Sequence, residues 1–284
     1  MCDYFGNTMI GNICSFHQAI PMFTLQLEEH HISYRKSGTG DPLLLVHGLG
    51  GDNTSWEFTE PYLSKNFELI LPDLRCHGAS GCTEGTPPPS DFAEDMIRLV
   101  EYLEIAPIPV VGTSLGGMVV QQMILERPDL FSHAVLIDTT PRVDERLVDM
   151  VYAWREAQID EGDKAYWWTA TKDTLTPRFI EENPDTLDYL LNKFLSSENE
   201  ANILSAIGFA TFDAVNLLQS VTIPVLVIHG EIDQLIILED GKLLHKSIPG
   251  SRLEIIAGCG HSPDIEVPEK LSSLITSFVK NEGA

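Results

Sequence analysis

Short apolar runs of strand length, separated by helical patterns, constrain the fold of this sequence more than any other feature. The runs are Leu43–Val46, Phe67–Leu71, Val110–Val111, Ala134–Ile137, Val225–Ile228 and Leu253–Ile256. The clearest helical patterns between them span Asp91–Leu103 and Leu115–Arg127, and Pro128 closes the second. Buried strands that alternate with helices form a mostly parallel sheet with helices on both faces. The sequence therefore predicts an α/β fold.

The chain divides into a leader, a core and an insertion. Residues 1–21 show no helical or strand periodicity, whereas residues 22–27 alternate like a strand, so the core is expected to start near Met22. The first segment is either a flexible, disordered leader or lies upstream of an alternative translation start. Residues 141–215 are helical in pattern throughout and hold three of the four tryptophans. They predict a helical cap inserted into a core of residues 22–140 and 216–284.

Charge and hydropathy exclude two classes of partner. Lys and Arg together number 18 and Asp and Glu 42, which gives a formal net charge of −24. A chain this acidic repels the phosphates of nucleic acids, so no nucleic-acid partner is expected. The longest apolar runs are far shorter than the ~20 residues that span a bilayer, so no membrane span is expected either.

Cysteine usage and the N-terminal segment predict the compartment. The five cysteines are Cys2, Cys14, Cys76, Cys82 and Cys259. They are few, scattered and odd in number, which favours free thiols in a reducing compartment. A signal peptide needs a basic start and an unbroken apolar stretch, but the first Lys or Arg is Arg35 and polar residues interrupt residues 10–20. We therefore expect a cytoplasmic protein.

The strongest local motif is Gly-x-Ser-x-Gly at residues 112–116, between a predicted strand and a predicted helix. In that context the motif forms a sharp turn that presents a nucleophilic serine, here Ser114, and the glycines allow close backbone packing. The adjacent helix N-terminus favours negative charge that develops on an acyl oxygen. The alternative is a glycine-rich turn whose serine only caps the helix.

A nucleophilic serine needs a base, and the sequence offers one together with a carboxylate. Asp233 follows the run Val225–Ile228, and His261 follows Leu253–Ile256 in a glycine-rich loop. The order Ser, Asp, His along the chain is the one found on mostly parallel α/β sheets. Asp138, directly after the run that ends at Ile137, is the competing candidate for the carboxylate.

With these motifs the chain resembles the α/β-hydrolase fold serine hydrolases from about Met22 to Val279. The resemblance implies that Ser114 is the nucleophile, that His261 is the general base and then the general acid, and that Asp233 orients the imidazole. Asp138 stays an alternative because some members carry the acid after this earlier strand. The resemblance implies neither a metal nor an organic cofactor.

A second match lies in Val46–Gly51, directly after a predicted strand. It resembles the oxyanion loop of the family, which implies that the backbone N–H groups of Leu49 and Leu115 hold the oxyanion. Taken without the family, the glycines could form a dinucleotide fingerprint, but the third glycine is missing at the required offset.

A third match, Asp73–Ser80, is similar to the family's Asp-x-Arg-Gly-His-Gly-x-Ser loop, with Cys76 in place of the first glycine. These polar groups are expected to tie loops together near the site. The ligand types of Cys76, His77 and Cys82 would suit a metal, but the paired spacing of a zinc site is absent. No metal site is predicted.

The cap is expected to select the substrate. Trp154, Trp167 and Trp168, together with Tyr166, either line an apolar pocket for the substrate or form the core of the cap. The elbow and its helix resemble those of 3-oxoadipate enol-lactonases and small carboxylesterases. A lactonase would need a cation for the carboxylate of its substrate, and Arg142, Arg146 and Arg155 in the cap are candidates.

The resemblance implies a serine esterase that cleaves a small or medium-sized ester through an acyl-enzyme. Lactone hydrolysis is the first alternative, followed by hydrolysis of carbon–carbon bonds in diketo acids and by a slow-turnover ligand receptor. The expected partner is a small-molecule ester or lactone, and the sequence leaves the oligomeric state open.

Overall fold

The computed structural model describes residues 21–196 and 205–281, with the side chains of 205–207 and 281 left out of the description. The leader expected over residues 1–21 lies outside the described residues except for Pro21. Within the described part of the chain, every helix is too short or too polar to cross a membrane.

An eight-stranded sheet forms the centre of the molecule, in the order β1-β2-β4-β3-β5-β6-β7-β8. The strands are β1 (Met22–Gln26), β2 (His31–Gly38), β3 (Asp41–Val46), β4 (Phe67–Pro72), β5 (Ile108–Thr113), β6 (Phe131–Ile137), β7 (Val225–Gly230) and β8 (Arg252–Ile256). Strand β2 runs antiparallel to both of its neighbours, and every pairing from β4 to β8 is parallel. The predicted α/β fold with a mostly parallel sheet is confirmed. The apolar runs did not indicate strand β2, because its sequence is largely polar.

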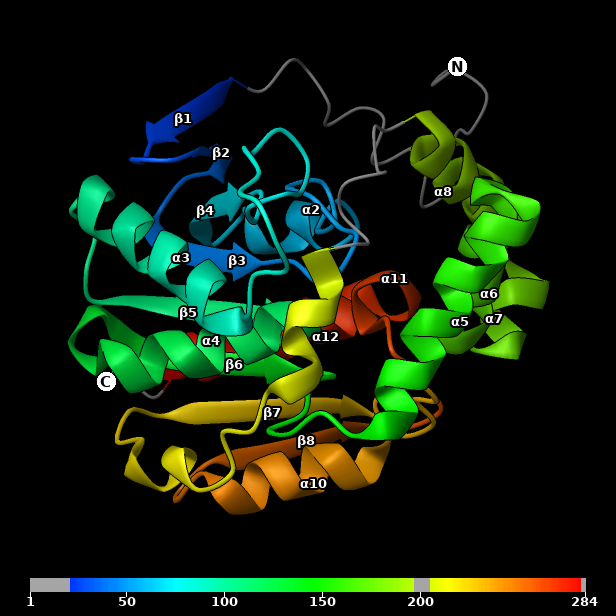
Figure 1. The fold of residues 1–284 in the computed structure, drawn as a ribbon. Coiled ribbons are helices and arrows are strands. Elements are labelled where there is room, and N and C mark those ends of the chain that lie inside the picture. The colour runs from blue at the N-terminus through cyan, green and yellow to red at the C-terminus, as the bar shows by residue number, and fades with distance from the viewer. Residues whose placement is uncertain (1–20, 197–204, 282–284) are drawn as a thin grey trace.

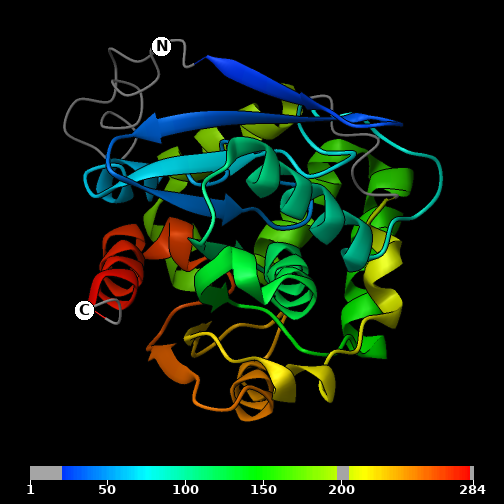
Figure 2. The same ribbon diagram turned by 90° about the vertical axis from the view of Figure 1, so that its left-hand side faces the viewer.

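Helices cover both faces of this sheet. The helices are α2 (Glu60–Leu63), α3 (Pro89–Leu103), α4 (Leu115–Glu126), α5 (Glu145–Glu161), α6 (Asp163–Thr174), α7 (Pro177–Glu182), α8 (Pro184–Ser196), α10 (Leu238–Ser247), α11 (Pro263–Glu266) and α12 (Pro268–Asn281). Short 3₁₀ turns η2 (Pro128–Leu130), η3 (Ser205–Thr211) and η4 (Leu217–Ser220) connect some of them. Figure 2 shows α12 on the opposite side of the sheet from α3.

The hydrophobic core has two layers because strand side chains alternate between the faces of the sheet. In β3, Leu44 and Val46 join the layer that includes α3 and α4, whereas Leu43 and Leu45 join the layer that includes α2 and α12. All four side chains are fully buried. This double burial explains why the strands appear in the sequence as continuous apolar runs.

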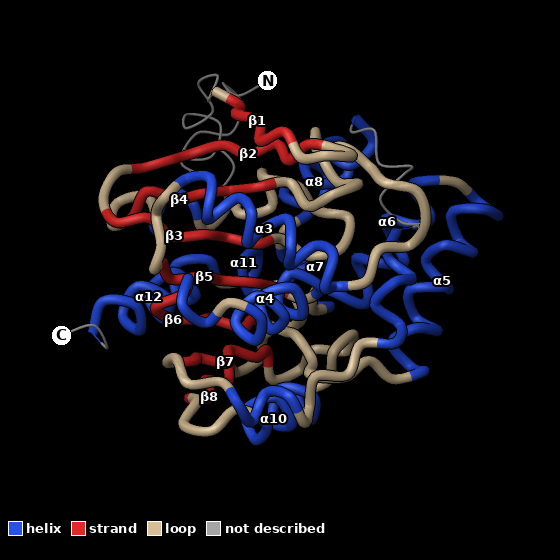
Figure 3. The backbone as a smooth tube through the Cα atoms, turned by 60° about the vertical axis from the view of Figure 1, so that its left-hand side comes forward, coloured by secondary structure: helices blue, strands red, loops and turns tan. Residues whose placement is uncertain are grey.

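Helices α5 to α8 form a separate group inserted between β6 and β7. In Figure 1 this group lies beyond the ends toward which the arrowheads of β3 and β7 point, and Figure 3 shows α5 and α6 well to the side of the strands. Asp144 caps α5 by accepting a hydrogen bond of 2.9 Å from the N–H of Leu147. The group thus faces the carboxyl edge of the sheet, where the loops that follow the parallel strands meet. Its treatment as a cap domain over residues 141–215 stays a prediction.

A disulfide joins Cys76 and Cys82, so the prediction of free thiols is wrong for these two cysteines. The loop after β4 folds back on itself, with the N–H of Cys76 donating to the carbonyl of Gly81 at 3.0 Å. This turn brings the two Cα atoms within 4.2 Å, a closeness that sequence spacing does not reveal. Cys259 is free and buried, and the two remaining cysteines lie outside the described residues. Two of the five cysteines therefore no longer support the prediction of a reducing compartment.

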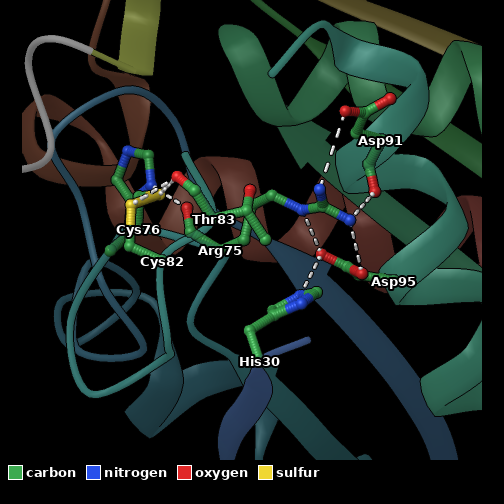
Figure 4. The surroundings of a disulfide bond; sticks show 8 residues. His30, Arg75, Cys76, Cys82, Thr83, Asp91 and Asp95 are labelled. Carbon is green, nitrogen blue, oxygen red and sulfur yellow. Dashed lines mark hydrogen bonds and ion pairs between the residues drawn. A yellow bond between two sulfur atoms is a disulfide. The ribbon is translucent and has the colours of Figure 1, made fainter. Parts of the chain in front are cut away.

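Figure 4 shows how the disulfide loop is tied to α3 through its neighbour Arg75. The guanidinium donates to Asp95 at 2.6 and 2.8 Å, and His30 contacts the same carboxylate at 3.1 Å. Asp91 lies 3.6 Å from the guanidinium on the exposed side. The disulfide and the buried carboxylate of Asp95 therefore both hold the loop after β4 in place.

Candidate active site

Ser114 occupies a strained turn between β5 and α4. Its backbone has φ 53° and ψ −121°, a conformation that L-residues rarely adopt. A Cβ atom at Gly112 would overlap the carbonyl of Gly116, and one at Gly116 would overlap the carbonyl of Val46. Only glycine at both positions permits this close approach, and the turn projects Ser114 from the end of the strand.

His261 and Asp233 form a buried pair on the loops that follow β8 and β7. The imidazole Nδ1 lies 2.7 Å from Oδ2 of Asp233. The other oxygen, Oδ1, accepts hydrogen bonds from the N–H groups of Leu235 at 2.8 Å and Ile236 at 3.0 Å. The N–H of His261 itself donates to the carbonyl of Thr174 at 3.0 Å. The carboxylate is therefore fixed in orientation, with one oxygen aimed at the imidazole.

Ser114 and His261 line the same cavity, which has a volume of about 330 Å³. Leu49 and Leu115 line it as well. The loop after β3 passes directly beside the serine, since a Cβ atom at Gly48 would lie 3.2 Å from Cβ of Ser114. The structure thus brings together the residues predicted to act as nucleophile and base with the two residues predicted to bind an oxyanion, and Asp233 pairs with the imidazole.

His47 holds the loop after β3, the predicted oxyanion loop, through both of its ring nitrogens. Nε2 accepts a hydrogen bond of 3.0 Å from the N–H of Leu74, so Nδ1 carries the proton and donates to the carbonyl of Gly48 at 2.7 Å. Burial lowers the pKa of His47, which keeps the ring neutral and this arrangement intact.

A buried polar network that the sequence analysis missed also holds the loop after β3. Asp73 accepts from the backbone and side chain of Asn53 at 2.6 and 2.8 Å, and from the N–H of Ala79 at 2.9 Å. Arg35 donates to Asn53 and forms a two-pronged ion pair with Glu60 at 2.8 and 2.6 Å. Asp73 and Ala79 lie in the Asp73–Ser80 match, whereas nothing in the sequence indicated that Arg35, Asn53 and Glu60 belong to this network.

The carboxyl of Asp138 binds the backbone of β7, whereas the imidazole of His261 pairs with Asp233. Its Oδ1 accepts a hydrogen bond of 2.7 Å from the N–H of Gly230, and its backbone has φ 43°. Complete burial, and then the nearby charge of Asp233, raise the pKa of Asp138 well above its ordinary value, which favours the neutral form of the group. These contacts favour Asp233 over Asp138 as the carboxylate that orients His261.

Asp138, Asp233 and His229 place one potential metal-ligand atom each within 4.8 Å of one another. However, Nε2 of His229 donates to the carbonyl of Ile236 at 2.8 Å, and both oxygens of Asp233 already accept hydrogen bonds. We therefore infer that these residues hold Asp233 and its loop in position rather than bind a metal. The sulfurs of Cys76 and Cys82, considered above as metal ligands, are bonded to each other.

The cap tryptophans divide between the cavity and the packing of the helices. Trp154 and Trp167 line the cavity, and Nε1 of Trp154 donates to Asp173 at 2.6 Å. Trp168 is outside the lining, and its ring packs edge-on against Trp167 at 4.9 Å between centroids. Tyr166 stacks on Phe194 at 5.6 Å, and burial raises the pKa of its hydroxyl to about 12. Trp154 and Trp167 therefore contact the cavity and Trp168 packs against Trp167, and a role of these rings in substrate binding stays a prediction.

Fold and cavity together are those of an α/β hydrolase, and the comparisons with known proteins agree. The family model for the alpha/beta hydrolase fold matches residues 41–266, and the chain belongs to this family, which confirms the predicted resemblance.

Relatives of different named activities cover nearly the whole chain. The 3-oxoadipate enol-lactonase 2 of Acinetobacter baylyi is 27% identical over 262 residues, which cover 90% of this chain and 96% of that protein. The pyrrolizixenacetamide deacetylase of Xenorhabdus hominickii is 26% identical and covers 92% of this chain and 99% of that protein. The structure of a thermophilic esterase from Thermogutta terrifontis has a TM-score of 0.81 at 25% identity, covering 92% of this chain and 98% of that one.

Proposed function

We propose that the protein is a serine hydrolase that cleaves carboxylic esters of small or medium size through an acyl-enzyme on Ser114. The observation that carries this proposal is the shared cavity: Ser114 on a strained elbow and His261, hydrogen-bonded to Asp233, line the same cavity. An esterase and an enol-lactonase among the similar proteins support ester or lactone hydrolysis.

The proposed reaction has two halves that use the same groups. His261 takes the proton of Ser114 as the oxygen attacks the ester carbonyl, and it then protonates the departing alcohol. Water, activated by the same imidazole, next attacks the acyl-enzyme and restores Ser114. Asp233 holds the imidazole in the required tautomer and stabilises its charged form.

The amides of Leu49 and Leu115 are the proposed oxyanion donors. Among the residues that the structure describes, neither N–H donates to another protein group. Leu115 is also the first residue of α4, where the helix dipole adds positive potential. Removing one such donor typically slows catalysis by roughly 10²- to 10³-fold.

A lactone is the second candidate substrate, because it presents the same carbonyl and the same leaving oxygen within a ring. The named activity of the Acinetobacter relative favours it. The structure offers no separate observation in favour of carbon–carbon bond hydrolysis or a receptor role.

The test compares p-nitrophenyl esters from acetyl to decanoyl with wild type, Ser114→Ala and the surface control Ser273→Ala on α12. We expect Ser114→Ala to lose on the order of 10⁴- to 10⁶-fold in kcat, and Ser273→Ala to retain wild-type kcat. A fluorophosphonate should add one adduct to the wild-type peptide that contains Ser114. Full activity of folded Ser114→Ala would refute the proposal, and a burst that stops after one turnover would indicate a receptor instead of an enzyme.

A further inference from the structure

The charges around the cavity bear on which substrates it accepts. Its charged side chains, apart from His261, are Asp52, Glu57, Lys193 and Asp264. Within the described residues, Lys193 is the only Lys or Arg of the lining, against three carboxyl groups. Burial raises the pKa of Asp264 to about 6, so this group is still mostly ionised at pH 7.

The positive charge of Lys193 is already neutralised. Its Nζ lies 2.7 Å from Oε1 of Glu57 and donates to the carbonyl of Thr54 at 3.3 Å. The hydroxyl of Tyr189, one turn earlier on α8, donates to the other oxygen of Glu57 at 2.7 Å. Glu57 is only 3% exposed, whereas the side chain of Lys193 is 30% exposed, so solvent screens the ion pair from the lysine side only.

Asp52 also faces the ammonium group. Burial by itself would raise the pKa of Asp52, but Lys193 and hydrogen bonds from Thr54 outweigh burial and lower it. Lys193 therefore interacts with two carboxylates, Asp52 and Glu57. Their combined charge outweighs that of the ammonium group, so no net positive charge is available to bind a substrate.

The cap arginines do not supply the missing cation, since none of them lines the cavity. Arg146 donates to the carbonyl of Leu235 at 2.8 Å and lies 3.4 Å from Asp240, and Arg155 donates to Gln158 at 2.6 Å. Arg142 is exposed and pairs by its backbone with Asp213. The sequence expectation that one of these arginines binds a substrate carboxylate is not supported by their positions.

Most other side chains of the lining are apolar. They include Met118, Leu147, Val151, Trp154, Phe209 and Ile236. A carboxylate moved from water into such surroundings loses its hydration, and only a nearby cation or hydrogen-bond donor compensates for that loss. An aliphatic or aromatic group gains from the same transfer.

We propose that the site selects substrates with an uncharged acyl group and discriminates against acyl groups that carry a carboxylate, with Glu57 as the specificity-determining residue. This inference rests on the proposed function. Glu57 acts together with Asp52 by outweighing the charge of Lys193, so the discrimination is a property of this charge cluster and not of cavity size.

The test uses two esters of one length, 4-nitrophenyl methyl adipate and 4-nitrophenyl hydrogen adipate, which differ by a methyl ester against a free carboxylate. We expect wild type at pH 7.5 to show a kcat/KM at least about tenfold higher for the methyl ester. Glu57→Gln keeps an acceptor for Tyr189 but removes one of the two carboxylates that interact with Lys193, so the net charge beside the cavity becomes more positive. It should raise the ratio of acid to methyl ester about tenfold at low ionic strength, and added salt should reduce this gain.

The double variant Glu57→Gln/Lys193→Met is the matched control, because it also removes the lysine charge, restores the net charge of the wild-type cluster and should return the ratio to the wild-type value. Equal kcat/KM of wild type for both esters, or an unchanged ratio in folded Glu57→Gln, would overturn the inference. If neither ester releases nitrophenol, that result contradicts the proposed function instead. Calorimetric binding of the two esters to Ser114→Ala then decides the inference separately, with tighter binding of the methyl ester supporting it and equal affinities overturning it.

Discussion

Replacement of Asp233 by asparagine tests the geometry of the candidate site most directly. The N–H groups of Leu235 and Ile236 both donate to Oδ1, so the amide oxygen of the new side chain must keep that position. The amide NH₂ then faces Nδ1 of His261, where Oδ2 lay at 2.7 Å, and donates to it. The imidazole is forced to carry its proton on Nε2, where it cannot accept the proton of Ser114.

We expect Asp233→Asn to reduce kcat by ~10⁴-fold, equivalent to about 5 kcal/mol of transition-state stabilisation, with the fold intact. Steady-state hydrolysis of a p-nitrophenyl ester measures kcat, and circular dichroism checks the fold. Asp138→Asn is the matched control. The carboxyl of Asp138 favours its neutral form and accepts from Gly230, so an amide keeps both properties and should lose less than about tenfold. A larger loss in Asp138→Asn than in Asp233→Asn would refute this assignment.

Two further predictions concern stability. Burial holds the pKa of His77 near 3, below its ordinary 6.5, so below pH 6.5 the unfolded chain binds a proton that the folded chain refuses. Urea unfolding should therefore show about 2 kcal/mol more destabilisation between pH 7 and pH 5 in wild type than in His77→Gln, and equal pH responses would contradict it. Cys82→Ser opens the loop closed by a disulfide of sequence separation 6 and should lower the unfolding free energy by roughly 2 kcal/mol. A reducing agent should bring wild type to the same value and leave the variant unchanged, and insensitivity of wild type would disprove the bridge.

The arrangement of the candidate site was predictable because it follows from topology. Ser114, Asp233 and His261 each come directly after a parallel strand or a short loop beyond one, and the carboxyl ends of parallel strands share an edge. The strands themselves were evident as apolar runs, because both faces of the sheet are covered. Local sequence context was therefore sufficient to place three residues that lie far apart in the chain.

The groups that support the site were not predictable, since they depend on contacts between segments without motifs. Arg35 reaches Asn53 and Glu60 only because β2 pairs with the edge of β4. Glu57 meets Lys193 across 136 positions, and no periodicity relates a loop residue to one on a distant helix. The disulfide depended on the turn conformation of a loop whose sequence matched the family except at Cys76 itself.

The positions of these groups separate substrate choice from bond cleavage. His261 and Asp233 stand on loops of the sheet and are fixed by backbone groups, with one contact to α6 through Thr174. The charge proposed to act on the acyl group depends instead on Lys193 of α8 and its partner Glu57. We therefore expect a change at this ion pair to alter which acyl groups are accepted without altering the orientation of the imidazole. Because the cap side of the cavity can vary in this way over a constant sheet edge, one fold can accommodate esters and lactones of different charge with the same catalytic groups.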